Sequence, residues 1–439
     1  EALHAAQTGK SVMLVTGGAH WGGRFAGSSD TIEGKPARVW IEDTLRALAA
    51  MPNVTLKART LATGHYDHGM VALCERLTDH LPPAERGGPR QRLWRVRTGE
   101  LILASGAIER PLVFRGNDRP GVMLAGAARA YLFRYGVVAG RAIVVATNND
   151  SAWQAAFDLA EAEAHVAAIV DARTDPPAAL IERARSLGIA VHTGMAPAAA
   201  LGGRALRGVR IGRVSDTGRI EGATQTLRCD TLLVSGGWNP AVHLHSHGAG
   251  RLTLDTNLQS FLPLPAAGHR SVGGAAGDFA PASPIPALWS ISESADPDPE
   301  AWVDFQNDVT AGDVALAARE NFRSVEHLKR YTTLGMASDQ GKTSNVSGIG
   351  ILGMLLDKPM QAIGTTKFRP PYDPTPFGVF AGHRVGEGLR PRRRLALHDW
   401  HGRQGASLDE YGGWMRPAAY LRPGESEADA IRREVQAVR

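Results

Sequence analysis

One β-α-β unit limits the folds open to this chain most strongly. A strand is expected over 142–146, a polar turn over 147–150, a helix over 151–163 and a second strand over 166–170. Two strands joined by a helix in this way run parallel in one sheet. The hydrophobic pattern predicts further helices over 36–50, 125–135, 300–330 and 344–356, and further strands over 11–15, 101–109 and 231–234. The chain is therefore predicted to be an α/β protein with parallel sheets.

The turn of this unit has the chemistry of a helix cap. It reads Thr147-Asn-Asn-Asp150-Ser151 and lacks the G-x-G-x-x-G pattern that lets backbone approach a pyrophosphate. Asp171 lies 21 residues beyond Asp150, close to the spacing of an acid that binds a ribose hydroxyl. Nucleotide contact and an ordinary capped helix are both open on this pattern.

The first strand, over 11–15, is followed by two glycine pairs, Gly17-Gly18 and Gly22-Gly23. A glycine fingerprint for this unit would lie upstream of Glu1, and Thr16 and Gly17 stand where the ribose-binding acid is expected. The pair Gly22-Gly23 lets the backbone approach a cofactor, and a plain tight turn explains it equally well.

Small residues end two more strands. The segments are LASGAIE over 103–109 and VGGAAGD over 272–278. In this order around an inserted β-α-β domain they indicate a nucleotide beside the strand ends. Asp278 is then placed to bind ribose or ribitol hydroxyls, and a simple turn residue is the alternative.

The domain boundaries follow from these patterns. A first dinucleotide-binding domain is expected to be discontinuous, over 1–136 and 236–330, with a second such domain inserted at 137–235. A helical segment and proline-rich linker spans 331–390, and an Arg-, Trp- and Gly-rich stretch over 391–439 begins another domain. A chain of 439 residues is long enough for two or three domains.

Composition excludes several classes of protein. The net charge is only +5, and the basic run over 390–394 is most simply a solvated loop, so no nucleic acid partner is expected. Cys74 and Cys229 are too few for a disulfide framework. No stretch reaches the ~18 apolar residues that span a bilayer, so no membrane is expected and the cytoplasm is the expected compartment.

Histidines alternate at His243, His245 and His247, so on a strand they would share one face. Because no Cys, Asp or Glu joins them locally, a partly exposed strand edge or loop is expected, and no metal is assigned.

The segment Gly341-Lys-Thr-Ser-Asn345 precedes a predicted helix and combines a cation with backbone donors, which suits an anionic group. It lacks the upstream glycine of a P-loop, so NTP hydrolysis is not indicated, and a plain helix cap is the alternative.

Both ends have the pattern of an interrupted helix. Residues 1–10 carry an Ala/Leu pattern that closes on Gly9, and the helical pattern over 425–438 has no stop signal. The sequence is therefore expected to be the interior of a longer polypeptide.

Six long, chemically unusual segments carry a resemblance to a known family. They are SGAIERPLVFRGNDRPGVMLAGAARAYL (105–132), VVATNNDSAW (144–153), VSGGWNPAVHL (234–244), YTTLGMASDQGKTSN (331–345), GTTKFRPPY (364–372) and ALHDWH (396–401). Together they resemble the alpha subunit of heterotetrameric sarcosine oxidase. Hydrogen cyanide synthase, opine oxidase and hydroxyproline dehydrogenase subunits share the Ala-Ile-Glu-Arg-Pro segment but are not expected to share the part from Gly364 onward.

The resemblance implies a disulfide-reductase-like flavoprotein fold with two Rossmann-type dinucleotide-binding domains, followed by the start of an aminomethyltransferase-like, folate-binding α+β domain. It implies a subunit of an oxidoreductase acting on CH–NH donors, which demethylates sarcosine to glycine with hydrogen peroxide and 5,10-methylenetetrahydrofolate as products. In the family, FAD lies in the beta subunit, FMN lies at the alpha–beta interface and the alpha subunit holds NAD. Tetrahydrofolate is the co-substrate, and the expected partners are the beta, gamma and delta subunits.

The resemblance also implies roles for residues of this sequence. The residues expected to contact NAD are Gly22, Gly23, Arg24, Gly106, Gly277 and Asp278, and those expected to contact the FMN phosphate are Lys342, Thr343, Ser344 and Asn345. No catalytic residue is assigned, because the acid of the folate domain is expected beyond residue 439, and without its partners the chain is expected to be inactive.

Three hypotheses about the function of the chain therefore remain open. The first is the oxidase subunit. The second is a stand-alone FAD- or NAD-dependent oxidoreductase, or a subunit of an amine, opine or hydroxyproline dehydrogenase. The third is a non-catalytic scaffold with a decayed nucleotide site, which agrees with TNNDS in place of a glycine fingerprint over 147–151.

Overall fold

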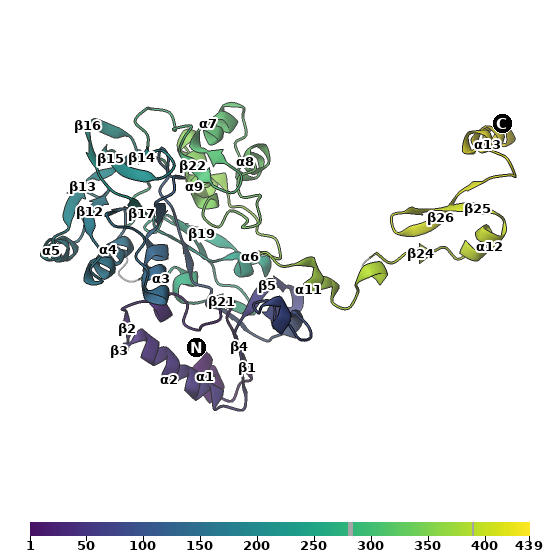
Figure 1. Cartoon of the computed structure of the whole chain (residues 1–439), viewed down its shortest axis with the longest axis horizontal. Helices are drawn as coiled ribbons and strands as arrows, with labels where there is room; N and C mark the ends of the chain where they lie inside the picture. Colours follow the sequence, from purple (N-terminus) through teal and green to yellow (C-terminus); the bar gives the residue numbers. More distant parts are fainter. Residues whose placement is uncertain (280–283, 389) are drawn as a thin grey trace. The chain divides into compact units, whose positions relative to one another are not determined.

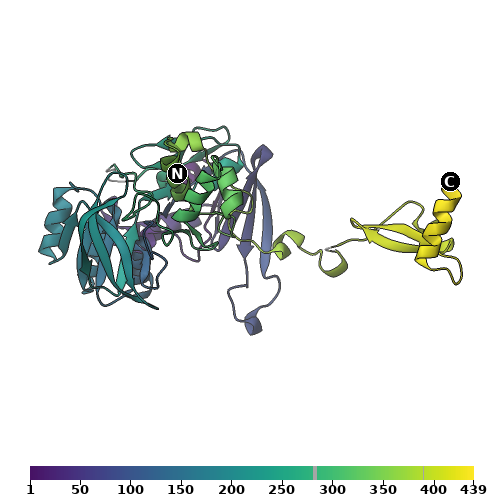
Figure 2. The same cartoon turned by 90° about the horizontal axis from the view of Figure 1, so that it is seen from above.

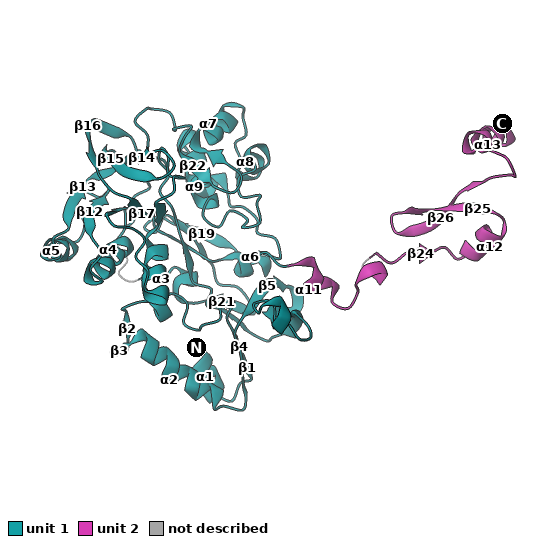
Figure 3. Cartoon of the chain, viewed as in Figure 1, with its two compact units in different colours: residues 1–375 teal, residues 376–439 magenta. Residues whose placement is uncertain are grey.

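The computed structural model describes residues 1–279, 284–388 and 390–439 (Figure 1). It divides into two compact units, unit 1 over 1–375 and unit 2 over 376–439 (Figure 3). Part of the Pro-, Ala- and Ser-rich stretch, residues 280–283, lies outside the described residues.

A five-stranded parallel sheet of unit 1 joins four strands of the segment predicted as an inserted domain, 137–235, with β10, which precedes that segment. This sheet and the elements that cover it are called the inserted domain below. The strand order is β10-β17-β11-β12-β13, and the strand bounds are Val122–Leu124, Thr231–Ser235, Ile143–Thr147, Val166–Asp171 and Ala190–Thr193. The predicted β-α-β unit is thereby confirmed, with helix α4 at Ser151–Glu161. Helices α3 (Ala125–Tyr135) and α5 (Ala178–Ser186) complete the layer that contains α4.

Both faces of this sheet are covered, which explains its unbroken apolar strands. Neighbouring residues of one strand point to opposite faces. Val145 and Ile169 pack with the helices, whereas Val144 and Val170 pack toward an antiparallel three-stranded sheet. That sheet consists of β14 (Met195–Gly202), β15 (Leu206–Val214) and β16 (Ile220–Leu227).

The first domain is built from smaller sheets. Two parallel pairs, β1 with β4 and β8 with β21, have the bounds Val12–Val15, Val54–Lys57, Leu101–Leu103 and His269–Ser271. Three antiparallel strands, β5 (Thr60–Tyr66), β6 (Met70–Arg76) and β7 (Gln91–Arg97), lie at the end of unit 1 opposite the inserted domain (Figures 1 and 2). Strands β9 (Ala107–Glu109) and β18 (Trp238–Pro240) pair antiparallel and, because one precedes and the other follows the inserted domain, are called the connector below.

The remaining elements of unit 1 are seven α-helices, six strands and four 3-10 helices among the described residues. The α-helices are α1 (Ala2–Gln7), α2 (Ala37–Ala49), α6 (His243–His247), α7 (Ala311–Arg319), α8 (Val325–Thr332), α9 (Asn345–Leu355) and α10 (Met360–Ile363). The strands are β2 (Thr31–Ile32), β3 (Lys35–Pro36), β19 (Leu252–Asp255), β20 (Ser260–Pro263), β22 (Trp302–Asp304) and β23 (Val309–Thr310). The 3-10 helices are η1 (Phe25–Gly27), η2 (Asp67–Gly69), η3 (Pro83–Glu85) and η4 (Gly273–Ala276).

The helix predicted over 300–330 is wrong in its first third, and the rest forms two helices, α7 and α8, separated by residues 320–324. A β22–β23 hairpin forms there because the Asp304 carboxylate accepts from the backbone N–H groups of Gln306 and Asn307, which closes a turn. Helix α7 starts only at the capping box of Thr310 and Asp313. The helix predicted over 344–356 is confirmed as α9.

Unit 2 is a small α+β unit. Its elements are α11 (Phe377–Ala381), η5 (Gly386–Gly388), β24 (Arg393–Arg394), α12 (His398–Arg403), β25 (Ala406–Tyr411), β26 (Trp414–Tyr420) and α13 (Glu427–Val438). The three strands form one sheet in the order β24-β26-β25. A capping box of Ser426 and Asp429 starts α13.

Substitution of Ile169 by alanine should destabilise the inserted domain strongly. The side chain is fully buried among the helices, so its removal leaves a cavity and costs about 3 kcal/mol of unfolding free energy. Chemical denaturation followed by circular dichroism measures this. Val39→Ala on α2, where the side chain is 43% exposed, serves as the control and should change stability by less than about 0.5 kcal/mol. Equal effects of the two substitutions would contradict the packing described.

Candidate functional site

Two glycine-containing turns begin where the parallel strands β8 and β21 end. The strands pair in register from Leu101 opposite His269 to Leu103 opposite Ser271, so the turns after them meet at one edge. Gly106 and Gly273 have φ of +73° and +58°, which suit glycine. No heavy atom of the described residues lies within 4 Å of where a Cβ would stand on either of them. The carboxyl edge of this strand pair therefore presents open backbone, as a dinucleotide requires.

The predicted residues Gly106, Gly277 and Asp278 come together at this edge. A Cβ on Gly274, in η4, would stand 3.5 Å from Gly106 Cα. Asp278 directly follows Gly277 and is exposed, and its N–H donates to Gly273 O at 3.1 Å. Gly277 has a packing role of its own, because a Cβ there would lie 2.5 Å from Leu262 Cδ2.

The predicted loop Gly22-Gly23-Arg24 reaches the connector. The Arg24 guanidinium carbon lies 5.5 Å from the ring centroid of Trp238, whose register partner is Glu109. A Cβ on Gly22 would stand 2.3 Å from Ile41 Cδ1, so Gly22 allows the loop to pack on α2, whereas Gly23 faces open space within the described residues. Arg24 is thus near the strand that follows Gly106.

Glu109 is a residue for which the sequence patterns gave no role. Its side chain is buried at the end of β9, where Oε2 accepts from the backbone N–H of Gly126 at 2.7 Å. Burial raises the pKa of this carboxyl to about 7, against the lowering effect of hydrogen bonds from Ser235 and Gly126 and of the Arg129 and Arg24 charges. A carboxyl that titrates near neutral pH beside a candidate cofactor edge is a common feature of functional sites.

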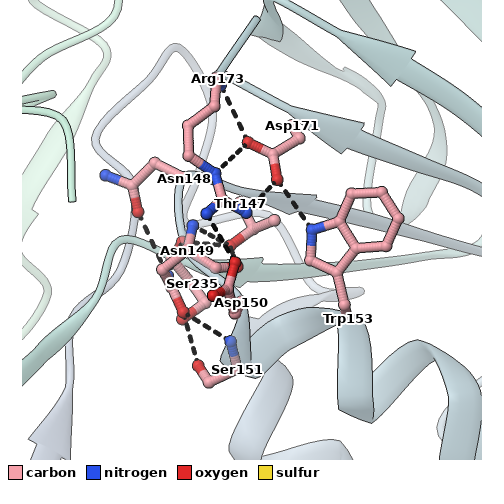
Figure 4. Close-up of polar contacts among 9 residues, drawn as sticks. All are labelled: Thr147, Asn148, Asn149, Asp150, Ser151, Trp153, Asp171, Arg173 and Ser235. Atoms are coloured by element: carbon pink, nitrogen blue, oxygen red, sulfur yellow. Dashed lines mark hydrogen bonds and ion pairs between the residues drawn. The ribbon is translucent and has the colours of Figure 1, made fainter. Parts of the chain in front are cut away.

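The turn after β11 has a different character, because its own side chains fill it (Figure 4). Thr147 and Asn149 are buried and both bond to Ser235. Asp171 is fully buried and accepts from Trp153 Nε1 at 2.8 Å and from Arg173 Nη2 at 2.7 Å. Both features favour the capped-helix alternative that the sequence left open.

The predicted phosphate residues surround the N-terminus of α9. Lys342 forms an ion pair with Asp373, and its Nζ lies 4.7 Å from the ring centroid of Tyr372. Ser344 Oγ donates to Asp304 at 3.3 Å, and Asn345 Nδ2 donates to Gln340 O at 2.8 Å. A small cavity of about 50 Å³ opens beside them, lined by Gly341, Lys342, Asn345, Phe368 and Tyr372 among others.

The structure corrects the environment expected for the three alternating histidines. His243, His245 and His247 belong to helix α6, not to an exposed edge or loop, and the first two are buried. The His243 ring stacks on Tyr372 at 3.9 Å between centroids. The ring of His269 lies 4.9 Å from that of His65 and 4.8 Å from that of His245. Among the residues that the structure describes, no three His, Cys, Asp or Glu side chains are arranged to hold a metal ion.

Replacement of His247 by leucine should flatten the acid sensitivity of the fold. Burial lowers the pKa of His247 to about 4, below its ordinary value of 6.5, so the unfolded chain binds the proton first. Stability is therefore lost as the pH falls below about 6.5 and stops falling near pH 4. Between pH 7.5 and 5, the unfolding free energy of H247L should fall less than that of the parent, by on the order of 1 kcal/mol. The thermal midpoint of each protein, measured across this pH range, tests this. H4Q, at an exposed position on α1, should keep the parental pH profile, and identical profiles for all three proteins would contradict the prediction.

Comparison with solved structures defines the class of protein. The chain resembles L-proline dehydrogenase from P. horikoshii with a TM-score of 0.62 at 17% identity, over 87% of this chain and 76% of that one. The predicted disulfide-reductase-like α/β fold, with one Rossmann-type domain inserted in another, is confirmed.

Comparison with curated sequences is more specific. The chain is 38% identical over 482 residues to sarcosine oxidase subunit alpha of Corynebacterium sp. strain P-1, and 39% identical over 478 residues to that of Rhizobium meliloti strain 1021. These alignments cover 100% of this chain but 49% and 47% of the relatives, so the chain spans about half their length. Residues 298–383 also match the family model of the sarcosine oxidase A3 domain. The chain is a homologue of the sarcosine oxidase alpha subunit, which confirms the resemblance carried by its segments.

Two further observations concern membrane spans and cysteines. Within the described ranges, no helix is long and apolar enough to cross a membrane. Cys74 and Cys229 are both buried free thiols.

Proposed function

We propose that this chain is the alpha-type subunit of a cytoplasmic sarcosine-oxidising complex, an oxidoreductase acting on CH–NH donors. Its role is to hold a dinucleotide, NAD, at the carboxyl edge of β8 and β21. The observation that carries the proposal is the open glycine backbone at Gly106 and Gly273, together with similarity to sarcosine oxidase alpha subunits over the whole chain.

The partners in this proposal are the beta, gamma and delta subunits. FAD in the beta subunit and FMN at the alpha–beta interface, when bound, accept the electrons of amine oxidation, and tetrahydrofolate takes up the one-carbon unit. The products are glycine, hydrogen peroxide and 5,10-methylenetetrahydrofolate. This chain's residues bind and orient cofactors, and the amine-oxidising groups belong to its partner.

The residues at the glycine edge fit a dinucleotide. Open backbone at Gly106, Gly273 and Gly23 admits a pyrophosphate closely, and the exposed Asp278 offers a carboxylate to sugar hydroxyls. Arg24 supplies a positive charge beside Trp238 of the connector. FAD at this edge is the competing occupant, and binding measurements distinguish the two.

Gly106→Ala should weaken binding of NAD by about tenfold, since the new methyl group enters the open edge. Equilibrium dialysis of the 439-residue chain with labelled NAD, and in parallel with FAD, measures this. Gly88→Ala is a matched control, because Gly88 also has a positive φ, +74°, and open surroundings within the described residues, but lies in the 82–89 loop. Parental affinity in G106A, or binding of neither dinucleotide by the parent, would overturn the assignment.

We assign the FMN phosphate to Lys342, Thr343, Ser344 and Asn345. The support is the Lys342 ammonium beside the N-terminus of α9, a helix of 11 residues whose first N–H groups attract an anion. Asp373, which pairs with Lys342, acts as the counter-ion that a phosphate would displace.

Lys342→Ala in the assembled complex should lower the FMN content by at least about threefold, because the phosphate loses its cation. Flavin content is measured by absorbance after release or digestion of the protein. Lys358→Ala, at an exposed position beyond the other end of α9, is the matched control and should leave the content unchanged. Unchanged flavin content and electron transfer in K342A would remove this assignment.

A further inference from the structure

The fold has a second edge at which a dinucleotide is expected, the turn between β11 and α4 in the inserted domain. A nucleotide at such an edge needs open backbone, free N–H groups at the helix start and an available acid at the end of the next strand.

The backbone of the turn is not open. Thr147, Asn148 and Asn149 are 1%, 1% and 5% exposed. Thr147 Oγ1 donates to Ser235 O, and Asn149 Nδ2 donates to both the O and the Oγ of Ser235, at 3.1 to 3.2 Å. These bonds tie the turn to the end of the neighbouring strand β17 and leave no space at the edge.

The first N–H group of the helix is satisfied from within the turn. Asn149 Oδ1 accepts from the N–H of Ser151 at 3.1 Å and from its hydroxyl at 2.6 Å. The amide side chain thus takes the place that a phosphate oxygen would occupy.

The acid at the end of β12 is also engaged. Asp171 is fully buried, and both of its oxygens accept from the Arg173 guanidinium at 2.7 to 3.0 Å. The same guanidinium donates to Asp150 Oδ1 at 2.6 Å, so it bridges the turn and the strand end (Figure 4). Arg173 therefore satisfies the carboxylate that would otherwise receive ribose hydroxyls.

The sealed turn has a contact on its outer side that points toward the first domain. Ser151 Oγ accepts from Trp238 Nε1 at 2.8 Å. Trp238 belongs to the connector, and its ring lies under Arg24 at 5.5 Å. A chain of contacts therefore runs from the sealed turn to the loop 22–24 of the first domain, through Asn149, Ser151, Trp238 and Arg24.

We infer that the inserted domain binds no nucleotide, and that its sealed turn instead positions Trp238 to support the Arg24 loop of the first domain. The relevance of that support to cofactor binding rests on the function proposed above, whereas the sealing itself does not.

Photoaffinity labelling with 8-azido-NAD tests the sealing. The purified 439-residue chain is irradiated with the probe at saturating concentration, and the labelled peptides are mapped by mass spectrometry. Labels are expected in first-domain peptides around 22–24, 104–109 and 272–278, and not in peptides covering 147–153 or 171–173. Labels in the latter two would overturn the inference. Labels in no peptide would refute the proposed function but agree with a sealed inserted domain.

Hydrogen exchange tests the positioning without any nucleotide. Ser151→Ala and Trp238→Phe both remove the Ser151–Trp238 hydrogen bond, and W238F keeps an aromatic ring under Arg24. Each should speed amide exchange in the 21–28 loop by at least about twofold at unchanged global stability. Ser186→Ala is the control, since its exposed hydroxyl bonds only locally to Arg183 O in α5. Parental exchange rates in both S151A and W238F would overturn the positioning role.

Discussion

One buried guanidinium holds the junction on which the rest of unit 1 depends. Arg110 directly follows β9 and is 2% exposed. It donates to Gly236 O, Gln259 O and Asn239 Oδ1 at 2.7 to 3.0 Å, and its guanidinium carbon lies 5.0 Å from the Trp289 ring centroid. Burial lowers its pKa to about 9, so it stays charged at neutral pH. A buried charge is tolerated only when such bonds satisfy it, so these carbonyls must keep their positions.

Unit 1 has two strand edges that share parallel pairing and differ in chemistry. At β8 and β21 the turns after the strands contain Gly106 and Gly273, which have positive φ, and the backbone there stays accessible. At β11 and β12 the corresponding residues are Asn, Asp and Arg, and their side chains satisfy one another. Parallel pairing brings two strand ends together in both places, and the residues that follow the strands decide whether the edge is open or sealed.

Sequence patterns predicted the parts of the fold that depend on local burial. Strands β11, β12 and β17 are covered on both faces, so their apolar runs are continuous, and α3 matches its predicted bounds. The patterns failed where distant residues decide. Three alternating histidines look like a strand or loop, yet they form α6, where His243 stacks on Tyr372, more than 100 residues away in sequence. The hairpin of β22 and β23 was missed for a local reason, because the Asp304 carboxylate closes its turn by accepting from the N–H groups two and three residues further on.

The candidate site likewise has features that local sequence predicted and features that depend on three-dimensional placement. Small residues at strand ends were sufficient to predict open backbone after β8 and β21, and the two turns lie side by side because parallel strands end at a common edge. The state of Asp171 was not predictable, since its spacing suits a ribose and only the three-dimensional placement of Trp153 and Arg173 engages it. The raised pKa of Glu109 likewise arises from burial between the connector and α3. The sealed turn nevertheless keeps a direct contact with the neighbouring domain, because Ser151 Oγ accepts from Trp238 Nε1 of the connector at 2.8 Å.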